Sequence, residues 1–283
     1  MTEEAFDLAL LQQWVGKTET KQDVIQPGMA DALAATLDRA APGVGLPPLW
    51  HWIYFWTAVP ASEVGADGHP QRGGFLPPVP LPRRMWAGGR LNFTAPLVIG
   101  HSATRSSRIL DVTAKKGATG TLAFVTVQHE IAQDGRIAVT EEHDIVYRSL
   151  PQPGVAAPAA KPAPTAAAWS REIVPDAVLL FRYSALTFNG HRIHYDRSYV
   201  TQVEGYPGLI VHGPLIATLL LDLLHRNMPD AVVAQFSFRA VGPLFDIEPF
   251  TVCGQPAEDG RSVKLWARNN RGELAMQAEA TVA

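Results

Sequence analysis

An eighteen-residue segment rich in proline and alanine divides this chain more clearly than any other feature. Residues 151–168 contain five prolines and eight alanines. Such a segment has few large side chains to bury, and its prolines favour extended backbone, which is typical of a semi-rigid linker. About 150 residues precede it and about 115 follow it. Each part is long enough to bury a core of its own, so we predict two units, 1–150 and 169–283.

The two units share landmarks that occur in the same order. In each, an alternating strand pattern runs into a Pro-Leu pair, at residues 96–97 and 243–244. Each unit then ends in two alternating runs joined by a short turn, within 122–148 and 262–282. The turns contain Asp-Gly and Arg-Gly, which are hairpin signals. These landmarks indicate an internal repeat.

Each unit also contains one helical pattern before its hairpin. Gly28–Ala41 has apolar residues on one side, at helical spacing, and Leu215–Leu224 is apolar nearly all round. The second pattern therefore predicts a fully buried helix. A shorter run, Val178–Tyr183, has the composition of a strand. One helix packed on an antiparallel sheet, twice, predicts an α+β fold.

A long irregular insert, residues 42–89, interrupts the first unit. It is rich in aromatic residues at first, with Trp50, Trp52 and Trp56, and later in proline and glycine. A long irregular loop in a compact domain usually has a function. The alternative is an extra edge strand followed by a crossing over the surface.

Composition excludes several classes of protein and partner. The chain is 47% hydrophobic and 18% charged, with 24 basic and 27 acidic residues and a net charge of −3. It is therefore not wholly disordered, and nucleic acid is not an expected partner. A single cysteine, Cys253, forms neither an internal disulfide nor a thiolate cluster and fits a reducing compartment. No secretory signal is visible, and the longest apolar stretch is interrupted by polar residues. We expect a cytoplasmic protein with no membrane partner.

Chemistry-bearing side chains concentrate in the second unit. Residues 187–196 include Asn189, His191 and His194 within a loop that begins near Asn-Gly. About fifteen residues later, Gly213 and Pro214 precede the buried helix, which leaves the Gly213 N–H free to stabilise a negatively charged oxygen. The alternatives are a surface His191, a structural His194, and an Asp196 that only caps a helical turn. The first unit has no equivalent, so we predict one catalytic and one non-catalytic half.

At these residues the chain resembles the MaoC-like hot-dog family and its hydratase-2 signature. His194 matches the histidine of the motif Gly-Asp-x-Asn-Pro-Leu-His, and residues 210–213 match its downstream Val-His-Gly. Two positions depart from the motif, because Asn189 stands in place of aspartate and His191 in place of asparagine. The insert resembles the two-hot-dog subgroup, which includes mitochondrial type 2 hydroxyacyl-thioester dehydratases and bacterial mesaconyl-CoA and itaconyl-CoA hydratases. The resemblance implies a tandem (double) hot-dog, each half an antiparallel sheet wrapped on a central helix.

The resemblance also implies a reaction, the addition of water to an enoyl-CoA. His194 is the expected general base, Asn189 orients the water, and the Gly213 N–H binds the thioester oxygen. The imidazole and the amide are expected on opposite sides of a cleft. The proton donor stays open between His194, returning the water proton, and His191. No metal and no redox cofactor is expected, since CoA is part of the substrate.

The subgroup implies a short branched dicarboxylic substrate, mesaconyl-C4-CoA or itaconyl-CoA, hydrated to citramalyl-CoA. Its second carboxylate requires a cation, for which Arg83, Arg84 and Arg90 are candidates, although contacts with solvent or CoA phosphates are equally compatible. His191, His212 and Trp86 are further candidates for substrate binding. The alternatives are a dehydratase of general short-chain hydroxyacyl thioesters, a thioesterase, and a non-catalytic acyl-CoA-binding module. A homodimer is possible.

Overall fold

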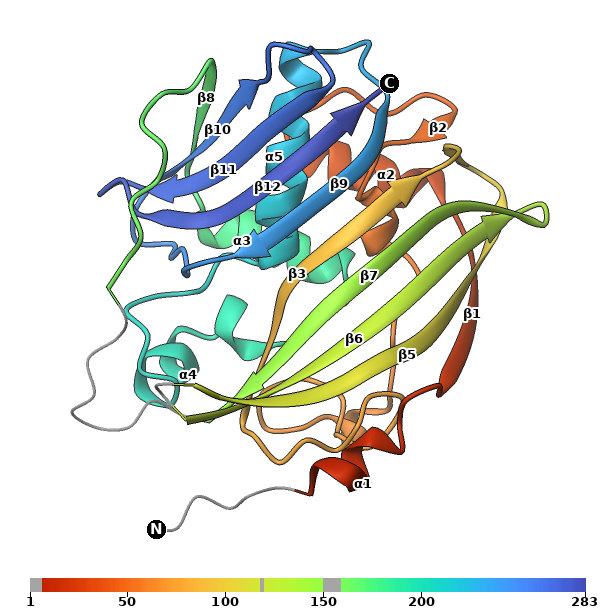
Figure 1. Ribbon diagram of the computed structural model, residues 1–283, viewed down its shortest axis with the longest axis vertical. Coiled ribbons are helices and arrows are strands. Elements are labelled where there is room, and N and C mark those ends of the chain that lie inside the picture. The colour runs from red at the N-terminus through yellow and green to blue at the C-terminus, as the bar shows by residue number, and fades with distance from the viewer. Residues whose placement is uncertain (1–6, 118–119, 150–158) are drawn as a thin grey trace.

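The computed structural model describes residues 7–117, 120–149 and 159–283. Ten strands form one antiparallel sheet in the order β1-β5-β6-β7-β3-β9-β12-β11-β10-β8 (Figure 1). Their bounds are β1 Thr18–Val24, β3 Arg83–Phe93, β5 Ser102–Gly117, β6 Gly120–Gln133, β7 Arg136–Arg148, β8 Trp169–Ile173, β9 Val233–Ala240, β10 Phe250–Pro256, β11 Ser262–Asn269 and β12 Leu274–Val282. A separate two-stranded sheet pairs β2 (Gly45–Leu46) with β4 (Leu97–Val98).

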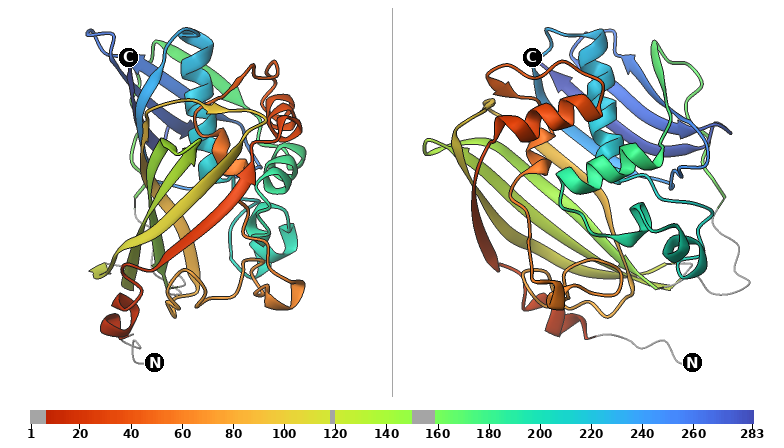
Figure 2. Two further views of the ribbon diagram at one scale, coloured as in Figure 1. Left: turned by 90° about the vertical axis from the view of Figure 1, so that its right-hand side faces the viewer. Right: turned by 180° about the vertical axis from the view of Figure 1, so that it is seen from behind.

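The helices lie mainly on one face of the large sheet (Figure 2). Their bounds are α1 Leu8–Gln12, α2 Pro27–Thr36, α3 Ala177–Leu186, α4 Arg197–Gln202 and α5 Gly213–Asn227, with 3-10 turns η1 Trp50–Ile53, η2 Ala61–Glu63 and η3 Arg192–His194. Within the described residues, none of these helices combines the length and the apolar character that crossing a bilayer requires.

The strand order shows the internal repeat directly. Read inward from either edge, the order is β1, β5, β6, β7, β3 in the first half and β8, β10, β11, β12, β9 in the second. The two halves join where β3 pairs antiparallel with β9. The two predicted hairpins are confirmed as β6–β7 and β11–β12. At the first turn Asp134 and Gly135 both have positive φ, of 49° and 75°, as a tight hairpin turn requires.

The Pro-Leu landmarks occupy corresponding places in the two halves. Leu97 pairs with Leu46 between β4 and β2, and Phe245, next to Leu244, forms a bridge with Ile210. The fifteen-residue helix α5 begins three residues after Ile210. In the first half, the corresponding strand β2 is followed only by the four-residue turn η1. The expectation of a central helix in each half was therefore only half right.

The counterpart of α2 is α3, since each follows the first strand of its half. The strand expected at Val178–Tyr183 was wrong, because this run lies inside α3. Asp176 caps the helix by accepting a hydrogen bond from the Leu179 N–H, and the side chains of Leu180, Tyr183 and Ser184 are buried at helical spacing. The first helix ends at Thr36, earlier than the predicted Ala41.

One main core extends across both halves. It combines Ile25 and Leu33 of the first half with Leu220 and Val252 of the second. Helix α5 is buried from Leu215 to Leu224, as predicted, and packs on β8, β10, β11 and β12.

The predicted linker lies partly outside the described residues, at 151–158. Its second part, residues 159–168, runs beside the turn between β11 and β12. The Ala163 N–H donates to the Gly272 carbonyl at 2.9 Å, and Ala163 packs with Cys253 and Trp266. This part of the linker is therefore attached to the second half.

The end of the insert forms a central strand, not an edge strand. Gly88 lies in β3 at the junction of the halves, where an added Cβ would be 2.6 Å from the Phe238 carbonyl oxygen of β9. A side chain at this position must push the two strands apart.

We therefore expect Gly88→Ala to lower the free energy of unfolding by about 1–3 kcal/mol, because overpacking displaces backbone. The matched control is Gly28→Ala in α2, where nothing lies within 4 Å of the added Cβ. Urea denaturation of both variants measures the difference. Equal stability of the two variants would contradict the tight junction.

Candidate active site

A cavity of about 1630 Å³ lies between the two halves. Its wall from the second half is the loop at 187–195 with the start of α5, and its wall from the first half is the insert with residues of β3 and β7. The first half has the short turn η1 where the second has α5, so the inner face of β3 and β7 is free to line the cavity. Trp86, His143 and Tyr147 lie on that face.

His194 ends the 3-10 turn η3 and is buried beside the cavity. Its Nδ1 lies 2.7 Å from the Ile210 carbonyl oxygen. A carbonyl only accepts, so Nδ1 carries the proton and Nε2 keeps a lone pair. Burial lowers the pKa of His194 to about 4, which keeps the ring neutral at physiological pH. A neutral imidazole with a fixed tautomer is suited to accept a proton.

The His212 ring packs against the His194 ring. The two imidazoles are stacked, with centroids 3.7 Å apart and planes 18° from parallel. His212 Nε2 lies 2.8 Å from the Ser184 hydroxyl, while its buried Nδ1 has no partner among the described residues. Burial holds the pKa of His212 well below its usual value, so it packs as a neutral ring.

Gly213 follows His212 directly and begins α5. No described residue accepts a hydrogen bond from its N–H, and Gly213 lines the cavity. Because His194 stacks on His212, its ring lies close to the residue that precedes this amide, and His194 and Gly213 both line the cavity. Their expected placement on opposite sides of a cleft stays a prediction.

Asn189 and His191 also line the cavity. The Asn189 side-chain oxygen accepts from the His191 backbone N–H at 3.0 Å, which leaves the side-chain NH₂ as the free group. The His191 ring lies 5.5 Å from the His194 ring, and burial lowers its pKa far below 6.5. The loop thus gathers the predicted polar groups in one place.

The remaining candidates divide into two groups. Trp86 and Arg84 line the cavity. Arg83 is buried in an ion pair with Glu204 at 2.9 Å, and Arg90 lies on the exterior in ion pairs with Glu142 and Asp144. Neither is among the residues that line the cavity, so the proposed role for Arg90 in substrate binding has no support in the geometry.

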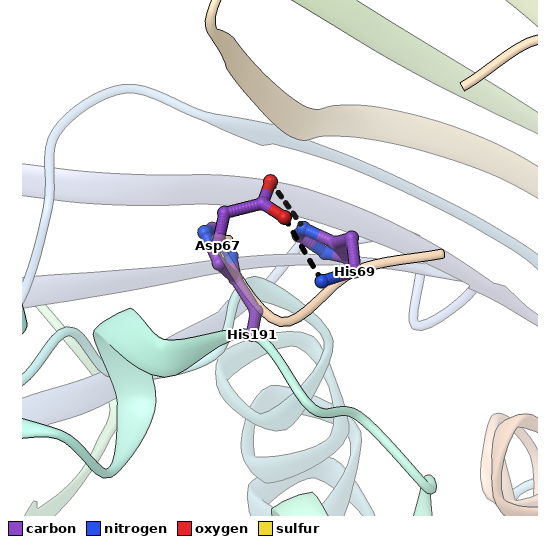
Figure 3. A group of neighbouring side chains, drawn as sticks. All are labelled: Asp67, His69 and His191. Carbon is purple, nitrogen blue, oxygen red and sulfur yellow. Dashed lines mark hydrogen bonds and ion pairs between the residues drawn. The ribbon is translucent and has the colours of Figure 1, made fainter. Parts of the chain in front are cut away.

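The structure adds two residues of the insert to the site, and the sequence analysis did not identify either of them. Asp67 and His69 lie beside His191, although they are more than 120 residues away in the chain (Figure 3). His69 Nδ1 is 3.2 Å from an Asp67 carboxylate oxygen, and the His69 backbone N–H donates to the other oxygen at 3.0 Å. The short Asp-Gly-His sequence was the only signal, and it resembles an ordinary turn.

A buried polar network fixes the aromatic wall in the first half. The Glu141 carboxylate accepts from the Trp52 indole at 2.9 Å and lies 3.2 Å from His51 Nε2. Burial works to raise the pKa of Glu141, but the two histidines beside it, His143 and His51, outweigh burial and hold it low. Trp52 in turn packs edge-on against Trp86, with centroids 4.7 Å apart.

Two groups of side chains have the composition of a metal site. They are Asp67, His69 and His191, and His129, Glu141 and His143, each with donor atoms within 4.8 Å of one another. In the first group Asp67 and His69 hydrogen-bond each other, and in the second Glu141 is hydrogen-bonded to Trp52. Both carboxylates are therefore satisfied without an ion, and we assign none.

Comparisons with known proteins show a family match over most of the chain. Residues 49–246 match the family described as hydroxyacyl-thioester dehydratase type 2. A mesaconyl-C(4)-CoA hydratase from Chloroflexus aurantiacus is 49% identical over 94% of this chain and 95% of its own.

Two solved structures show the same fold. A MaoC-like dehydratase from Phytophthora capsici has a TM-score of 0.70 at 14% identity, covering 98% of this chain and 99% of its own. A Mycobacterium tuberculosis protein described as a double hot-dog has a TM-score of 0.59 at 14% identity, covering 95% and 96%. The predicted double hot-dog is confirmed.

The buried histidines make stability depend on pH. Burial lowers the pKa of His129, His191, His194 and His212 in the fold. Below about pH 6.5 the unfolded chain binds protons that the folded chain does not, so acid favours unfolding.

We therefore expect the free energy of unfolding to fall between pH 7 and pH 5, by up to about 1.4 kcal/mol per pH unit for each such histidine. Urea denaturation at pH 7, 6 and 5 measures this. A stability that does not change over this range would show that these rings take up protons in the fold as readily as in the unfolded chain.

Proposed function

Because the chain belongs to the hydroxyacyl-thioester dehydratase type 2 family, we propose that it hydrates mesaconyl-C4-CoA to citramalyl-CoA. The family places it among the lyases that add water to, or remove it from, acyl thioesters. The proposed substrate rests on the relative with 49% identity over nearly the whole chain. The observation that supports the chemistry is that the neutral His194 and the free Gly213 amide line the same cavity.

The reaction needs a group that stabilises the thioester oxygen and a group that removes a proton from water. Gly213 and His194 supply these two functions. Water bonds to the β-carbon, and negative charge develops on the thioester oxygen. The Gly213 N–H and the positive end of α5 stabilise that oxygen, while His194 Nε2 accepts the proton from water. The Asn189 NH₂ group and the His191 ring line the same space and orient the water.

The second carboxylate of the substrate is attached to the β-carbon, so its cation must lie near the water-activating groups. Arg84 lines the cavity and is close enough to His69 and His191 to lower their pKa values. We assign Arg84 as the carboxylate ligand, since a guanidinium binds carboxylate through two donors. Trp86 and Trp52 form the apolar wall beside it.

Replacement of His194 by alanine is expected to lower kcat for mesaconyl-C4-CoA hydration by about 10²–10⁴-fold, because a general base is lost. The matched control is His225→Ala, whose ring also donates Nδ1–H to a backbone carbonyl, that of Leu221, but does not line the cavity. The assay follows loss of enoyl absorbance without release of free thiol. If His194→Ala kept more than about a tenth of the activity, another residue would be the base; thiol release would indicate a thioesterase.

Gly213→Pro removes the proposed oxyanion donor while keeping a backbone conformation suited to the first turn of a helix. We expect kcat to fall by about 10²–10³-fold. Gly213→Ala keeps the N–H, and its added Cβ has its nearest contact at 3.8 Å, so this control should retain most of the activity. Equal losses in both variants would mean that the amide is not a donor.

Arg84→Gln tests the substrate class. It is expected to lower kcat/KM for mesaconyl-C4-CoA by at least tenfold more than for crotonyl-CoA, which has no second carboxylate. Arg90→Gln, on the exterior, should change neither value. If wild-type enzyme prefers crotonyl-CoA or octenoyl-CoA, the general hydroxyacyl-thioester dehydratase is the better assignment.

A further inference from the structure

The loop at residues 187–195 has an amide, Asn189, where the hydratase-2 motif that it resembles has a carboxylate. An amide neither accepts nor donates a proton in this pH range. Hydration nevertheless requires a group that delivers a proton to the α-carbon. The motif loop contains no other carboxylate that lines the cavity, within the described residues. A group from another part of the chain can supply this proton.

The insert brings a carboxylate and an imidazole to this place. Asp67 and His69 belong to a turn at residues 65–69 that is held against the motif loop (Figure 3). The Arg192 backbone N–H donates to the Asp67 carbonyl at 2.9 Å, and the Arg192 guanidinium donates to the Ala66 carbonyl at 3.0 Å.

Two glycines make this contact close. Gly68 has a φ of +89°, and a Cβ added to it would be 1.9 Å from the Gly190 carbonyl oxygen. A Cβ added to Gly190 would in turn be 2.7 Å from the Gly68 carbonyl oxygen. The backbones of the two halves therefore touch, and the insert is a fixed part of the site rather than a loop that passes over it.

Asp67 and His69 are arranged as an ordered pair. His69 lines the cavity, whereas Asp67 is not among the lining residues. The carboxylate accepts from His69 Nδ1 at 3.2 Å, so Asp67 fixes the tautomer and leaves Nε2 as the other reactive atom. Burial works to raise the pKa of Asp67, but the hydrogen bonds from His69 outweigh it, and the carboxyl is ionised.

His69 also stands at the end of a row of imidazoles. Its ring centroid is 4.0 Å from that of His191, which is 5.5 Å from that of His194. The row thus connects the general base of the second half with the Asp67–His69 pair of the first. Short rearrangements of these rings, or a water between them, carry a proton along the row.

We propose that His69 is the second acid–base residue of the hydration and that Asp67 positions it. This inference rests on the proposed hydratase function. It assigns to the first half, which the sequence analysis predicted to be non-catalytic, one of the two proton-transfer groups.

Each proton in the proposed hydration has a donor and an acceptor. As the water oxygen bonds to the β-carbon, an O–H bond of water breaks and His194 Nε2 takes the proton. The former double-bond electron pair forms a C–H bond at the α-carbon with the proton from Nε2 of protonated His69, leaving that ring neutral. The proton on His194 then passes through His191 to His69, and the enzyme returns to its starting state. Dehydration uses the same steps in reverse.

The charges around His69 determine how the rate depends on pH. Asp67 favours the protonated ring, while Arg84, Arg72 and burial oppose it, as does a protonated His191. Burial is the largest of these influences and lowers the pKa of His69. Activity should therefore decline as pH rises through this lowered pKa, already below about pH 6.5, because the acid form of His69 is lost. Removing the Asp67 charge should move this decline to lower pH.

The experiment compares His69→Gln and Asp67→Asn with wild-type enzyme on mesaconyl-C4-CoA and crotonyl-CoA. The matched controls are His101→Gln and Asp134→Asn, an exposed histidine–aspartate pair 3.9 Å apart that does not line the cavity. Thermal unfolding of every variant tests its fold. Asp67→Asn keeps the size and shape of the side chain, so it remains informative if the His69 variant does not fold.

We expect His69→Gln to lower kcat at least 100-fold on both substrates, with KM within about threefold, since acid–base groups contribute about 10²–10⁴-fold. Asp67→Asn should lower kcat about tenfold and shift the decline of kcat/KM with rising pH to lower pH. The controls should match wild type, and treatment with EDTA should leave activity unchanged.

Three results would overturn the inference. One is His69→Gln retaining more than a tenth of kcat. Another is a loss seen only in KM for the dicarboxylic substrate, which would make His69 a carboxylate ligand. The third is loss of activity in EDTA that Zn²⁺ restores, which would make the cluster a metal site. If wild type hydrates neither substrate, the proposed function fails together with the inference; if wild type is active and the variants match it, only the inference fails.

Discussion

The hydrogen bond from His194 Nδ1–H to the Ile210 carbonyl holds the site together. It fixes the tautomer of the ring and connects the motif loop to the segment that leads into α5. Two residues later His212 stacks on the same ring, and Gly213 follows His212 at the start of α5. One backbone carbonyl therefore helps to set the position of His194 relative to Gly213, the proposed base and oxyanion donor. The helix is buried along ten consecutive residues, so that position is rigid.

The asymmetry between the halves explains where the cavity lies. The second half buries α5 against its sheet, while the first half has only η1 at the corresponding place. The polar network around Glu141 fixes Trp52, and Trp52 and Trp86 cover part of the exposed sheet. A second long helix would fill this volume, so the short turn η1 leaves the cavity open.

The sequence predicted those features that depend on local patterns. The hairpins followed from alternation and Asp-Gly, the buried helix from Leu215–Leu224, and the polar loop from residues close together in the chain. The strand prediction for Val178–Tyr183 was wrong. Its β-branched and aromatic residues fit a strand, but the Asp176 cap and the burial of side chains at helical spacing favour a helix. The sequence analysis missed Asp67 and His69 as site residues because their neighbours in space are about 120 residues away in the chain. No local sequence pattern indicates such a contact.

The same limit explains why the Asp67–His69 pair beside His191 could not be recognised from the sequence. The chemical role of a side chain depends on where it lies in space, and not on where it lies in the sequence. The contact between Gly68 and Gly190 brings the insert as close to the motif loop as two backbones can approach. At that distance a residue from the first half stands beside His191 as closely as a neighbour in sequence would. Asn189 accepts a hydrogen bond from the His191 backbone N–H and shapes the loop, and the proposed assignment divides the proton chemistry between the two halves.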